Sequence, residues 1–350
     1  MLIQKGVVSC FYKYKRKFGL LQEAFLKQQR TFTTNEDRVA NKLKIIFFGT
    51  DDFSLPSLRE LHRKIETSDL GVVTSFKNPS NPVRIYAEQQ MIPLYRWPVL
   101  PDICRNYDLG VVVSFGHLIP EHIINSFRLG MINVHASLLP LWRGAAPIMY
   151  AIMHGDKETG VSIMRIEPRK FDIGDILAQQ KIPIAADILM PELHARLASD
   201  GAKLLSKVIS EYPASFQNSV KQNNSAATLA PKITPAITKL HWSSMSSTEI
   251  FNRYRALYSF KHLSTKFRGK SLQIVELSKA DDKPTTNGPV QAGSFLYSSH
   301  RKCLKVCCAN QSFIEVHKLR IEGKKVMSAA EFKNGFLKNL NDEELLFSHE

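Results

Sequence analysis

The sequence lacks the features that would place it in a membrane or hold it together by disulfides. No apolar run approaches the roughly 20 residues needed to cross a bilayer. The 5 cysteines in 350 residues form no CxxC pair. An odd number without paired spacing argues against a disulfide framework and for a reducing compartment. We therefore expect no membrane partner, and we interpret Cys303, Cys307 and Cys308 as residues that fill a strand, with no metal site.

Several catalytic signatures are also absent. There is no GxSxG elbow of a serine hydrolase, no phosphate-binding P-loop, and no GxGxxG after the first predicted strand. The turn that begins with Gly49 and Thr50 lacks the second and third glycines of that last motif. A dinucleotide-dependent oxidoreductase and a serine hydrolase are therefore both disfavoured.

Positive charge is present in excess and is unevenly distributed. The formal net charge is +15, of which residues 1–40 hold +5, residues 41–220 hold +1 and residues 221–350 hold +9. A basic C-terminal part joined to a neutral one indicates a polyanionic partner, and nucleic acid is the first candidate. A lysine-rich surface that is merely solvated explains the same excess equally well.

The first residues have the composition of a targeting segment. Residues 1–34 hold seven Lys or Arg and the single acid Glu23, and the stretch from Leu20 to Gln28 can form a short amphipathic helix. Such basic, acid-poor sequences are typical of mitochondrial transit peptides, whereas a secretory signal would need an apolar core. We assign residues 1–40 to a transit peptide or disordered tail and expect a protein of the mitochondrial matrix.

Residues 41–216 alternate between short apolar runs and helical patterns. Strands are predicted at 44–48, 70–74, 109–114, 131–136 and 161–166, with helices at 53–64, 83–90 and 188–212. Strands that are apolar on both faces and alternate with helices are typical of a mainly parallel sheet in an α/β domain.

The composition changes after this domain. Residues 217–235 are polar and are predicted to be a linker. After it we predict a helix at 247–258 and short strands at 271–277, 293–297, 303–308 and 313–319. Several short strands in so few residues predict a small β-barrel over residues 236–341, with the OB fold as one option, and such barrels commonly bind nucleic acid.

Three kinds of polar side chain stand out near the ends of predicted strands. Asn133 and His135 are two residues apart on one strand, so their side chains share a face. A carboxylate follows the strand at 161–166, where Asp172 and Asp175 compete for the role. Functional groups gather at the carboxyl ends of strands in such sheets, and we expect all of these residues there. Amide, imidazole and carboxylate together suffice for acyl transfer without a covalent intermediate.

The stretch GMINVHASLLPLWRGAAPI (130–148) resembles the signature of the 10-formyltetrahydrofolate-dependent formyltransferases. Its part WRGAAPI is most similar to the methionyl-tRNA formyltransferases. Further matches follow in order, at IIFFGTDDFSLPSL (45–58), VVSFGHLIP (112–120), GDKETGVSIMRIE (155–167), FDIGD (171–175), LHWSSMSSTEIFNRYRAL (240–257) and GKKVMSAAEF (323–332). The resemblance covers nearly all of residues 43–340. Two departures are Ala136, where the family often has glycine, and residues 75–90, which are shorter than the basic insertion of bacterial relatives.

The resemblance implies a Rossmann-like formyltransferase domain and a C-terminal OB-like domain that helps to hold tRNA. It implies transfer of a formyl group from 10-formyltetrahydrofolate, the co-substrate, to the amino group of methionyl-tRNA for mitochondrial translation initiation. It implies that Asn133, His135 and Asp172 are the catalytic residues, and so favours Asp172 over Asp175 as the catalytic carboxylate. We expect a monomer that needs no metal.

The resemblance and the charges also imply binding residues. A flat pterin needs an apolar slot with a few polar groups, and the folate is expected at Phe115, Gly116, His117, Leu118, Ile119, Ser137, Leu138, Leu139 and Pro140. The methionyl group and the acceptor end are expected at Arg143, Gly144, Ala145, Ala146 and Pro147. The candidate tRNA-binding residues are Lys77, Arg84, Lys266, Arg268, Lys270, Arg301, Lys302, Lys305, Lys324 and Lys325.

Three other functions are compatible with the same site. A formyltransferase acting on a small amine is disfavoured by the basic C-terminal part, because a small amine offers no polyanion to bind. A non-catalytic RNA-binding relative is disfavoured by the presence of Asn133, His135 and Asp172 together. The third alternative is a hydrolase that passes the formyl group to water.

Overall fold

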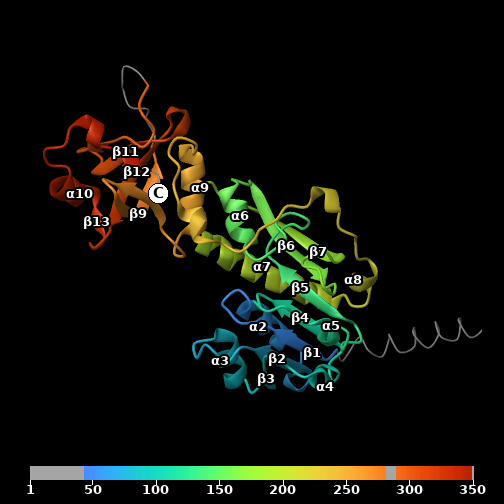
Figure 1. The fold of residues 1–350 in the computed structure, drawn as a ribbon. Coiled ribbons are helices and arrows are strands. Elements are labelled where there is room, and N and C mark those ends of the chain that lie inside the picture. The colour runs from blue at the N-terminus through green and yellow to red at the C-terminus, as the bar shows by residue number, and fades with distance from the viewer. Residues whose placement is uncertain (1–42, 281–288, 349–350) are drawn as a thin grey trace, which may run out of the picture.

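The computed structural model describes residues 43–280 and 289–348 (Figure 1). The predicted transit peptide at residues 1–40 lies outside the described residues. Within them, no helix has both the length and the apolar character needed to span a membrane.

The N-terminal part is built on a seven-stranded sheet in the order β3-β2-β1-β4-β5-β6-β7. Its strands are β1 (Ile45–Phe48), β2 (Leu70–Thr74), β3 (Leu94–Arg96), β4 (Leu109–Val113), β5 (Met131–His135), β6 (Glu158–Arg165) and β7 (Ile176–Pro183). All pairs from β3 to β5 are parallel, whereas β6 runs antiparallel to both β5 and β7. The prediction of a mainly parallel sheet is confirmed. The edge strand β7 was not predicted, because ILAQQKIP contains too few apolar residues in a row.

The interior strand β1 shows why this sheet needs helices on both sides. All four of its side chains are buried, with Ile45 and Phe47 in one apolar core and Ile46 and Phe48 in another. The first core is covered by α2 (Leu55–Lys64), α3 (Pro82–Gln89), α6 (Pro147–Met153) and α7 (Met190–Ser210). The second is covered by α4 (Pro101–Cys104) and α5 (Glu121–Ile124). The short α8 (Ala214–Gln217) follows α7.

The C-terminal part is a curled antiparallel sheet in the order β10-β11-β12-β9-β8-β14, with β13 paired to β12. Its strands are β8 (Leu263–Phe267), β9 (Lys270–Lys279), β10 (Phe295–Ser298), β11 (Cys303–Cys307), β12 (Phe313–Ile321), β13 (Met327–Ser328) and β14 (Phe347–Ser348). A bridge between Ser294 and Leu346 brings the two ends of this order together. The helices α9 (Ser247–Leu257) and α10 (Ala329–Phe336) both begin with a capping box. The predicted OB-like architecture is confirmed.

The three clustered cysteines fill the C-terminal sheet, as interpreted from the sequence. Cys303, Cys307 and Cys308 are buried and free. Burial raises the pKa of the Cys303 thiol to about 11 and that of Cys308 to about 12. Buried thiols of this kind stay protonated and are poor nucleophiles.

Helix α9 joins the two parts of the molecule by packing against α6 (Figure 1). Arg255 of α9 is only 3% exposed. Its Nη1 donates to the carbonyls of Ala185 and Ile188, 3.2 Å away in each case, and its Nη2 donates to Asn252 Oδ1 at 2.9 Å. Desolvation lowers the pKa of the Arg255 guanidinium, so its burial depends on these bonds. Because Ala185 and Ile188 belong to the N-terminal part, Arg255 ties the two parts together.

We expect the substitution Arg255→Met to uncouple the two parts. It leaves two carbonyls without their donor, and each unsatisfied buried group costs about 1–3 kcal/mol. Differential scanning calorimetry should then show two unfolding transitions in place of one. The matched control is Arg253→Met, since Arg253 donates to the carbonyls of Ile237 and Lys239 on the C-terminal side. The control should lower the melting temperature without splitting the transition, and one transition in both variants would contradict the role of Arg255.

Candidate active site

Strand β5, in the interior of the N-terminal sheet, carries the first two candidate residues. Asn133 is aligned with Val112 of β4 and with Met164 of β6, and His135 is aligned with Ser162 of β6. The intervening residue Val134 belongs to the apolar core on the opposite face. The period of two along the strand therefore directs the amide and the imidazole to the same side.

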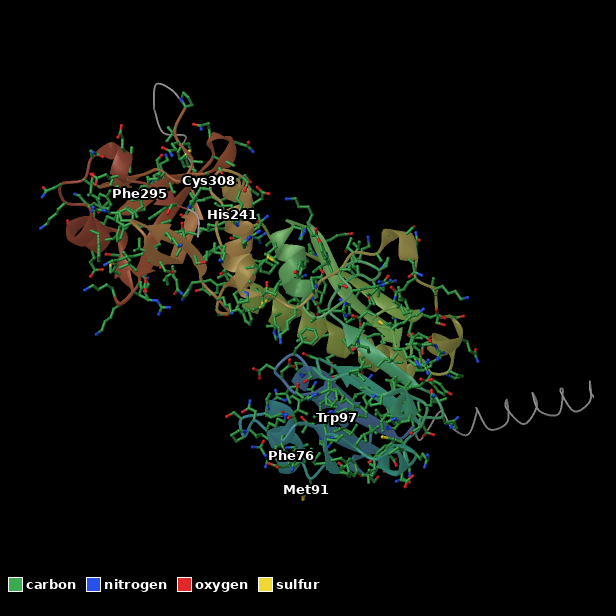
Figure 2. All side chains as sticks on the ribbon, viewed as in Figure 1. Phe76, Met91, Trp97, His241, Phe295 and Cys308 are labelled. Atoms are coloured by element: carbon green, nitrogen blue, oxygen red, sulfur yellow. The ribbon has the colours of Figure 1, made fainter. Side chains whose placement is uncertain are left out.

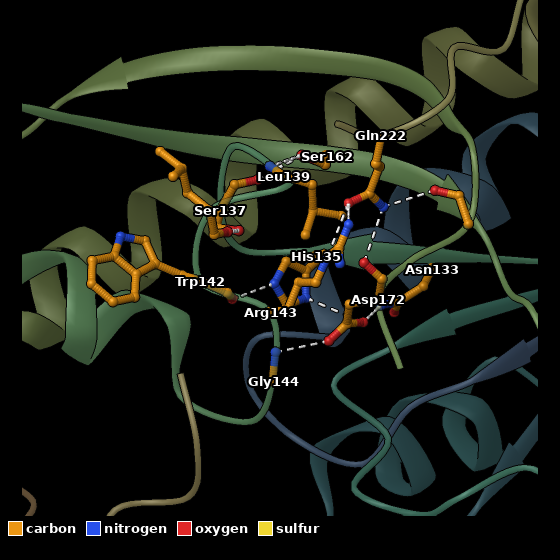
Figure 3. Close-up of polar contacts among 12 residues, drawn as sticks. Asn133, His135, Ser137, Leu139, Trp142, Arg143, Gly144, Ser162, Asp172 and Gln222 are labelled. Atoms are coloured by element: carbon orange, nitrogen blue, oxygen red, sulfur yellow. Dashed lines mark hydrogen bonds and ion pairs between the residues drawn. The ribbon is translucent and has the colours of Figure 1, made fainter. Parts of the chain in front are cut away.

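Asp172 meets both of these side chains (Figure 3). Its Oδ1 lies 3.5 Å from Asn133 Nδ2 and 3.6 Å from His135 Nδ1. Its Oδ2 accepts a hydrogen bond of 2.9 Å from the backbone N–H of Gly144. The side chain of Asp172 is 13% exposed, so its carboxylate is mostly removed from water. The competing Asp175 instead uses its carbonyl to accept from the backbone N–H of Arg165, where β7 begins.

The route by which Asp172 arrives differs from the one predicted. We expected it at the carboxyl end of a strand on the same edge as His135. However, β6 is antiparallel to β5, and its last residue Arg165 is aligned with Ile132 near the start of β5. That part of the prediction was wrong. The turn 166–175 begins at the opposite edge and folds back so that Asp172 reaches Asn133 and His135.

The ring of His135 meets an acceptor at each nitrogen. Its Nε2 lies 2.9 Å from the carbonyl oxygen of Trp142, and since a carbonyl only accepts, Nε2 is the donor. Its Nδ1 faces Asp172. The backbone of Trp142 is itself fixed, because its N–H donates to Thr228 Oγ1 at 2.9 Å and its indole Nε1 donates to Asp156 Oδ2 at 2.7 Å.

Three residues around the site hold left-handed backbone conformations without being glycine. They are Ser114 (φ 43), Trp142 (φ 60) and Asp172 (φ 53). Such conformations cost of order 1–3 kcal/mol each and persist only where the surroundings hold them. Ser114 follows β4, and its carbonyl accepts from Thr50 Oγ1 at 3.0 Å while its hydroxyl donates to Asp51. The loops that follow β1 and β4 are thus tied together.

The first predicted folate loop follows β4 and divides into buried and exposed residues. Phe115 and Ile119 belong to the apolar core on the α4–α5 side. Gly116, His117 and Leu118 are exposed, and Leu118 is 65% exposed. Among the five residues of this predicted loop, only Gly116, His117 and Leu118 are accessible to a ligand that approaches from solvent.

The second predicted folate loop follows β5 and is pinned to β6. The hydroxyl of Ser162 donates to the carbonyl of Ser137 at 2.6 Å and accepts from the N–H of Leu139 at 3.0 Å. Ser137 and Leu139 are buried, whereas Leu138 and Pro140 are partly exposed.

The predicted methionyl pocket lies on the next segment of chain. The N–H of Gly144 already binds Asp172, and the guanidinium of Arg143 is engaged with polar groups of residues 222–224. Ala145 is exposed and Ala146 partly so, while Pro147 is buried at the start of α6.

The predicted linker lies against this site. Val220 forms a bridge with Ile176, and the N–H of Ala230 donates to the carbonyl of Arg143 at 2.7 Å. Gln222 and Thr228 bind residues of the site directly. Sequence reasoning missed both, because a polar, proline-containing segment carries no signal for such contacts.

The candidate tRNA-binding cations on turns of the C-terminal sheet gather at one end of it. Arg268 lies in the β8–β9 turn, with Lys266 and Lys270 beside it, and Lys324 and Lys325 lie in the turn after β12. These two turns are neighbours, because the N–H of Glu322 donates to the carbonyl of Ser271 at 2.9 Å. The β10–β11 turn opens at the same end, since β11 begins opposite the second half of β12, and it holds Arg301 and Lys302.

Several members of that set, including some of this group, have partners within the chain. Arg84 pairs with Glu88 at 2.7 Å and lies over the ring of Phe76, whereas Lys77 is exposed. Further ion pairs and ring contacts are Arg301 with Glu315, Arg268 with Glu344, and Lys305 over Phe313. Figure 2 shows the side chains of both parts.

Comparison with known proteins assigns the class. Residues 104–209 match the family model of formyl transferases, and residues 232–337 match that of the formyl transferase C-terminal domain. The mitochondrial methionyl-tRNA formyltransferase of Bos taurus is 38% identical over 308 residues, covering 84% of this chain and 77% of that protein. That of Homo sapiens is 36% identical over 307 residues, covering 84% and 78%. The methionyl-tRNA formyltransferase of Coxiella burnetii is 36% identical over 309 residues, covering 83% and 95%. The chain belongs to the methionyl-tRNA formyltransferase family.

Solved structures agree on the fold. A sugar 3N-formyl transferase, WlaRD, crystallised with dTDP and 5-N-formyl-THF, gives a TM-score of 0.61 over 81% of this chain and 99% of that one, at 18% identity. An N-formyltransferase from Helicobacter canadensis, in complex with folinic acid and dTDP-3-aminofucose, gives 0.60 over 78% and 98%, also at 18% identity. At such low identity the likeness concerns the fold alone.

The substitution Gly144→Ala should displace the segment that lines the site. A Cβ at this position would lie 2.6 Å from the carbonyl oxygen of Ala230, and the φ of 126° is one that L-residues rarely adopt. We expect a loss of about 2–4 kcal/mol of folding stability, because backbone strain and a clash add together. Denaturant unfolding measures it. The control is Gly116→Ala, where φ is 72° but nothing lies within 4 Å, so only the strain remains. Equal losses in both variants would contradict the contact with Ala230.

Proposed function

We propose that this chain transfers the formyl group of 10-formyltetrahydrofolate to the amino group of methionyl-tRNA for translation initiation in mitochondria. The observation that carries the proposal is the meeting of Asp172 with Asn133 and His135. Membership of the family supports methionyl-tRNA as the acceptor. Two proteins of the same fold were crystallised with folates, which supports a folate as the donor.

The geometry supports a direct transfer. The free amine attacks the formyl carbon, and a C–N bond forms as the carbonyl oxygen gains negative charge. The second hydrogen of Asn133 Nδ2 is the donor that stabilises this oxygen. His135, whose Nε2–H is held by the carbonyl of Trp142 and whose Nδ1 faces Asp172, exchanges the proton of the attacking amine. The bond from the formyl carbon to the folate nitrogen then breaks, and the proton lost by the amine passes to that nitrogen. Asp172 orients His135 and takes part in moving the proton through a water. Positioning and preorganised donors supply most of the acceleration.

The exposure of the predicted loop residues indicates which of them form the binding surfaces for the folate and the methionyl group. The folate lies against the exposed Gly116, His117 and Leu118 and the half-buried Leu138 and Pro140, while the buried members of the two loops shape the slot from behind. The methionyl group enters beside Ala145.

The tRNA backbone lies across the basic turns of the C-terminal sheet. The cations at that end belong to the β8–β9, β10–β11 and β12–β13 turns. Of these, Lys324 and Lys325 are exposed and lie beside the β8–β9 turn. Contacts to phosphates release counterions, which suits a cluster of this kind to a polyanion.

The central prediction concerns the reaction itself. The full chain, incubated with 10-formyltetrahydrofolate and methionyl-tRNA, should yield formyl-methionine on the tRNA. Asn133→Ala should lower kcat by about 100-fold or more, as expected for the loss of one oxyanion donor. His135→Ala should abolish measurable formylation.

Both variants need a control for folding, which circular dichroism provides. A rate near that of the wild type for Asn133→Ala would end its role as an oxyanion donor. Absence of formylation by the wild type, with folate still bound, would shift the assignment to a small amine acceptor or to hydrolysis.

We further propose that the protein acts in the mitochondrial matrix. The curated relatives from Bos taurus and Homo sapiens are mitochondrial forms, and residues 1–34 are basic and acid-poor. A fluorescent protein fused to the C-terminus of the full chain should co-localise with a matrix marker. The same fusion without residues 1–40 should remain in the cytosol. Unchanged localisation of this shortened fusion would show that the mitochondrial targeting signal lies outside residues 1–40.

A further inference from the structure

Gln222 lies in the segment between the two parts of the molecule and binds the turn that carries Asp172. Its Nε2 donates to the backbone carbonyl of Asp172 at 3.0 Å and to that of Gly174 at 2.8 Å (Figure 3). An amide nitrogen has two hydrogens. Both are therefore used on carbonyls of the same turn.

Arg143 fixes the orientation of this amide. Its Nε and Nη2 donate to Gln222 Oε1 at 3.1 Å and 2.7 Å, and Nη2 also donates to Asn224 Oδ1 at 2.8 Å. A guanidinium only donates, so it must face the oxygen of the amide and leave the nitrogen for the carbonyls. The orientation of Gln222 thus follows from its neighbours on both sides.

The turn of Asp172 depends on such support. Asp172 has a φ of 53°, which a non-glycine residue keeps only when its surroundings impose it. Its neighbour Phe171 is 66% exposed, so apolar packing does little to hold that side of the turn. On the other side the turn lies tightly on β6, where a Cβ at Gly174 would come within 2.0 Å of the carbonyl oxygen of Arg165.

We propose that Gln222 is a positioning residue for formyl transfer. Through the carbonyls of Asp172 and Gly174 it holds the turn so that the carboxylate faces Asn133 and His135. The proposal rests on the proposed function, because it takes Asp172 as part of the reacting site. It also means that the segment leading to the C-terminal sheet completes the active site of the N-terminal part.

The test is Gln222→Met in the full chain, which keeps the length of the side chain and removes both donors. We expect kcat for methionyl-tRNA formylation to fall by about 10- to 100-fold, as when a group that orients a reacting residue is lost. The KM values for both substrates should stay within about twofold of the wild type, since Gln222 itself contacts neither substrate and Arg143 keeps its bond to Asn224 Oδ1. The matched control is Gln217→Met, an exposed position on α8, which should leave both parameters unchanged.

A double-mutant cycle with Asp172→Asn separates positioning from a general structural effect. If Gln222 acts through Asp172, then adding Gln222→Met to Asp172→Asn should lower the residual rate by less than about twofold. A full multiplicative loss in the double variant would overturn the proposal, as would a wild-type kcat for Gln222→Met.

A second variant covers the case in which Gln222→Met fails to fold. Gln222→Glu keeps two oxygens for Arg143 but has no hydrogens for the carbonyls, so it should show the same loss of kcat with an intact fold. A wild-type rate for this variant would overturn the proposal. A wild-type protein that does not formylate methionyl-tRNA would instead refute the proposed function, so the two failures are distinguishable.

Discussion

The carboxylate of Asp172 is where three separate segments of the chain meet. One oxygen lies against Asn133 and His135 of β5, and the other accepts from the N–H of Gly144. A mostly buried carboxylate costs free energy unless polar partners surround it, so Asp172 can occupy this buried position only because these contacts compensate for its lost hydration. Because the partners belong to a strand and to a loop, neither the loop nor the turn of Asp172 can move without disturbing the other. The geometry of the amide and imidazole is thereby set before any substrate binds.

The same site also depends on the connection between the two parts of the molecule. Residues 220–230 run along the loop that follows β5 and contribute Gln222 and Thr228 to it. Beyond this segment, α9 packs on α6 and Arg255 reaches back to the carbonyls of Ala185 and Ile188. The C-terminal sheet is therefore attached at two places rather than tethered by a free linker. A large polyanion held on its basic turns would have a defined relation to the reacting atoms, which is what positioning of an acceptor requires.

The parts of this arrangement that follow a local period were predictable from the sequence. Strand β1 is apolar on both faces, which indicates a covered sheet, and the spacing of Asn133 and His135 places them on one face. The contacts of Gln222 were not predictable, because they depend on a polar segment returning across the sheet to residues 50 positions earlier in the chain. Nor could the apolar pattern show that Phe115 and Ile119 would be taken up by the core while the residues between them stay exposed.

The reversal of direction at β6 explains why so much support converges on one turn. In a wholly parallel sheet, a residue after β6 would emerge at the same edge as His135 and reach it directly. Here β6 ends beside Ile132, at the opposite edge, and the chain must fold back over the sheet to bring Asp172 to Asn133 and His135. A turn in that position has no neighbouring strand to pair with until β7 begins. Its backbone carbonyls then need donors from elsewhere, and the amide of Gln222, oriented by Arg143, supplies two of them.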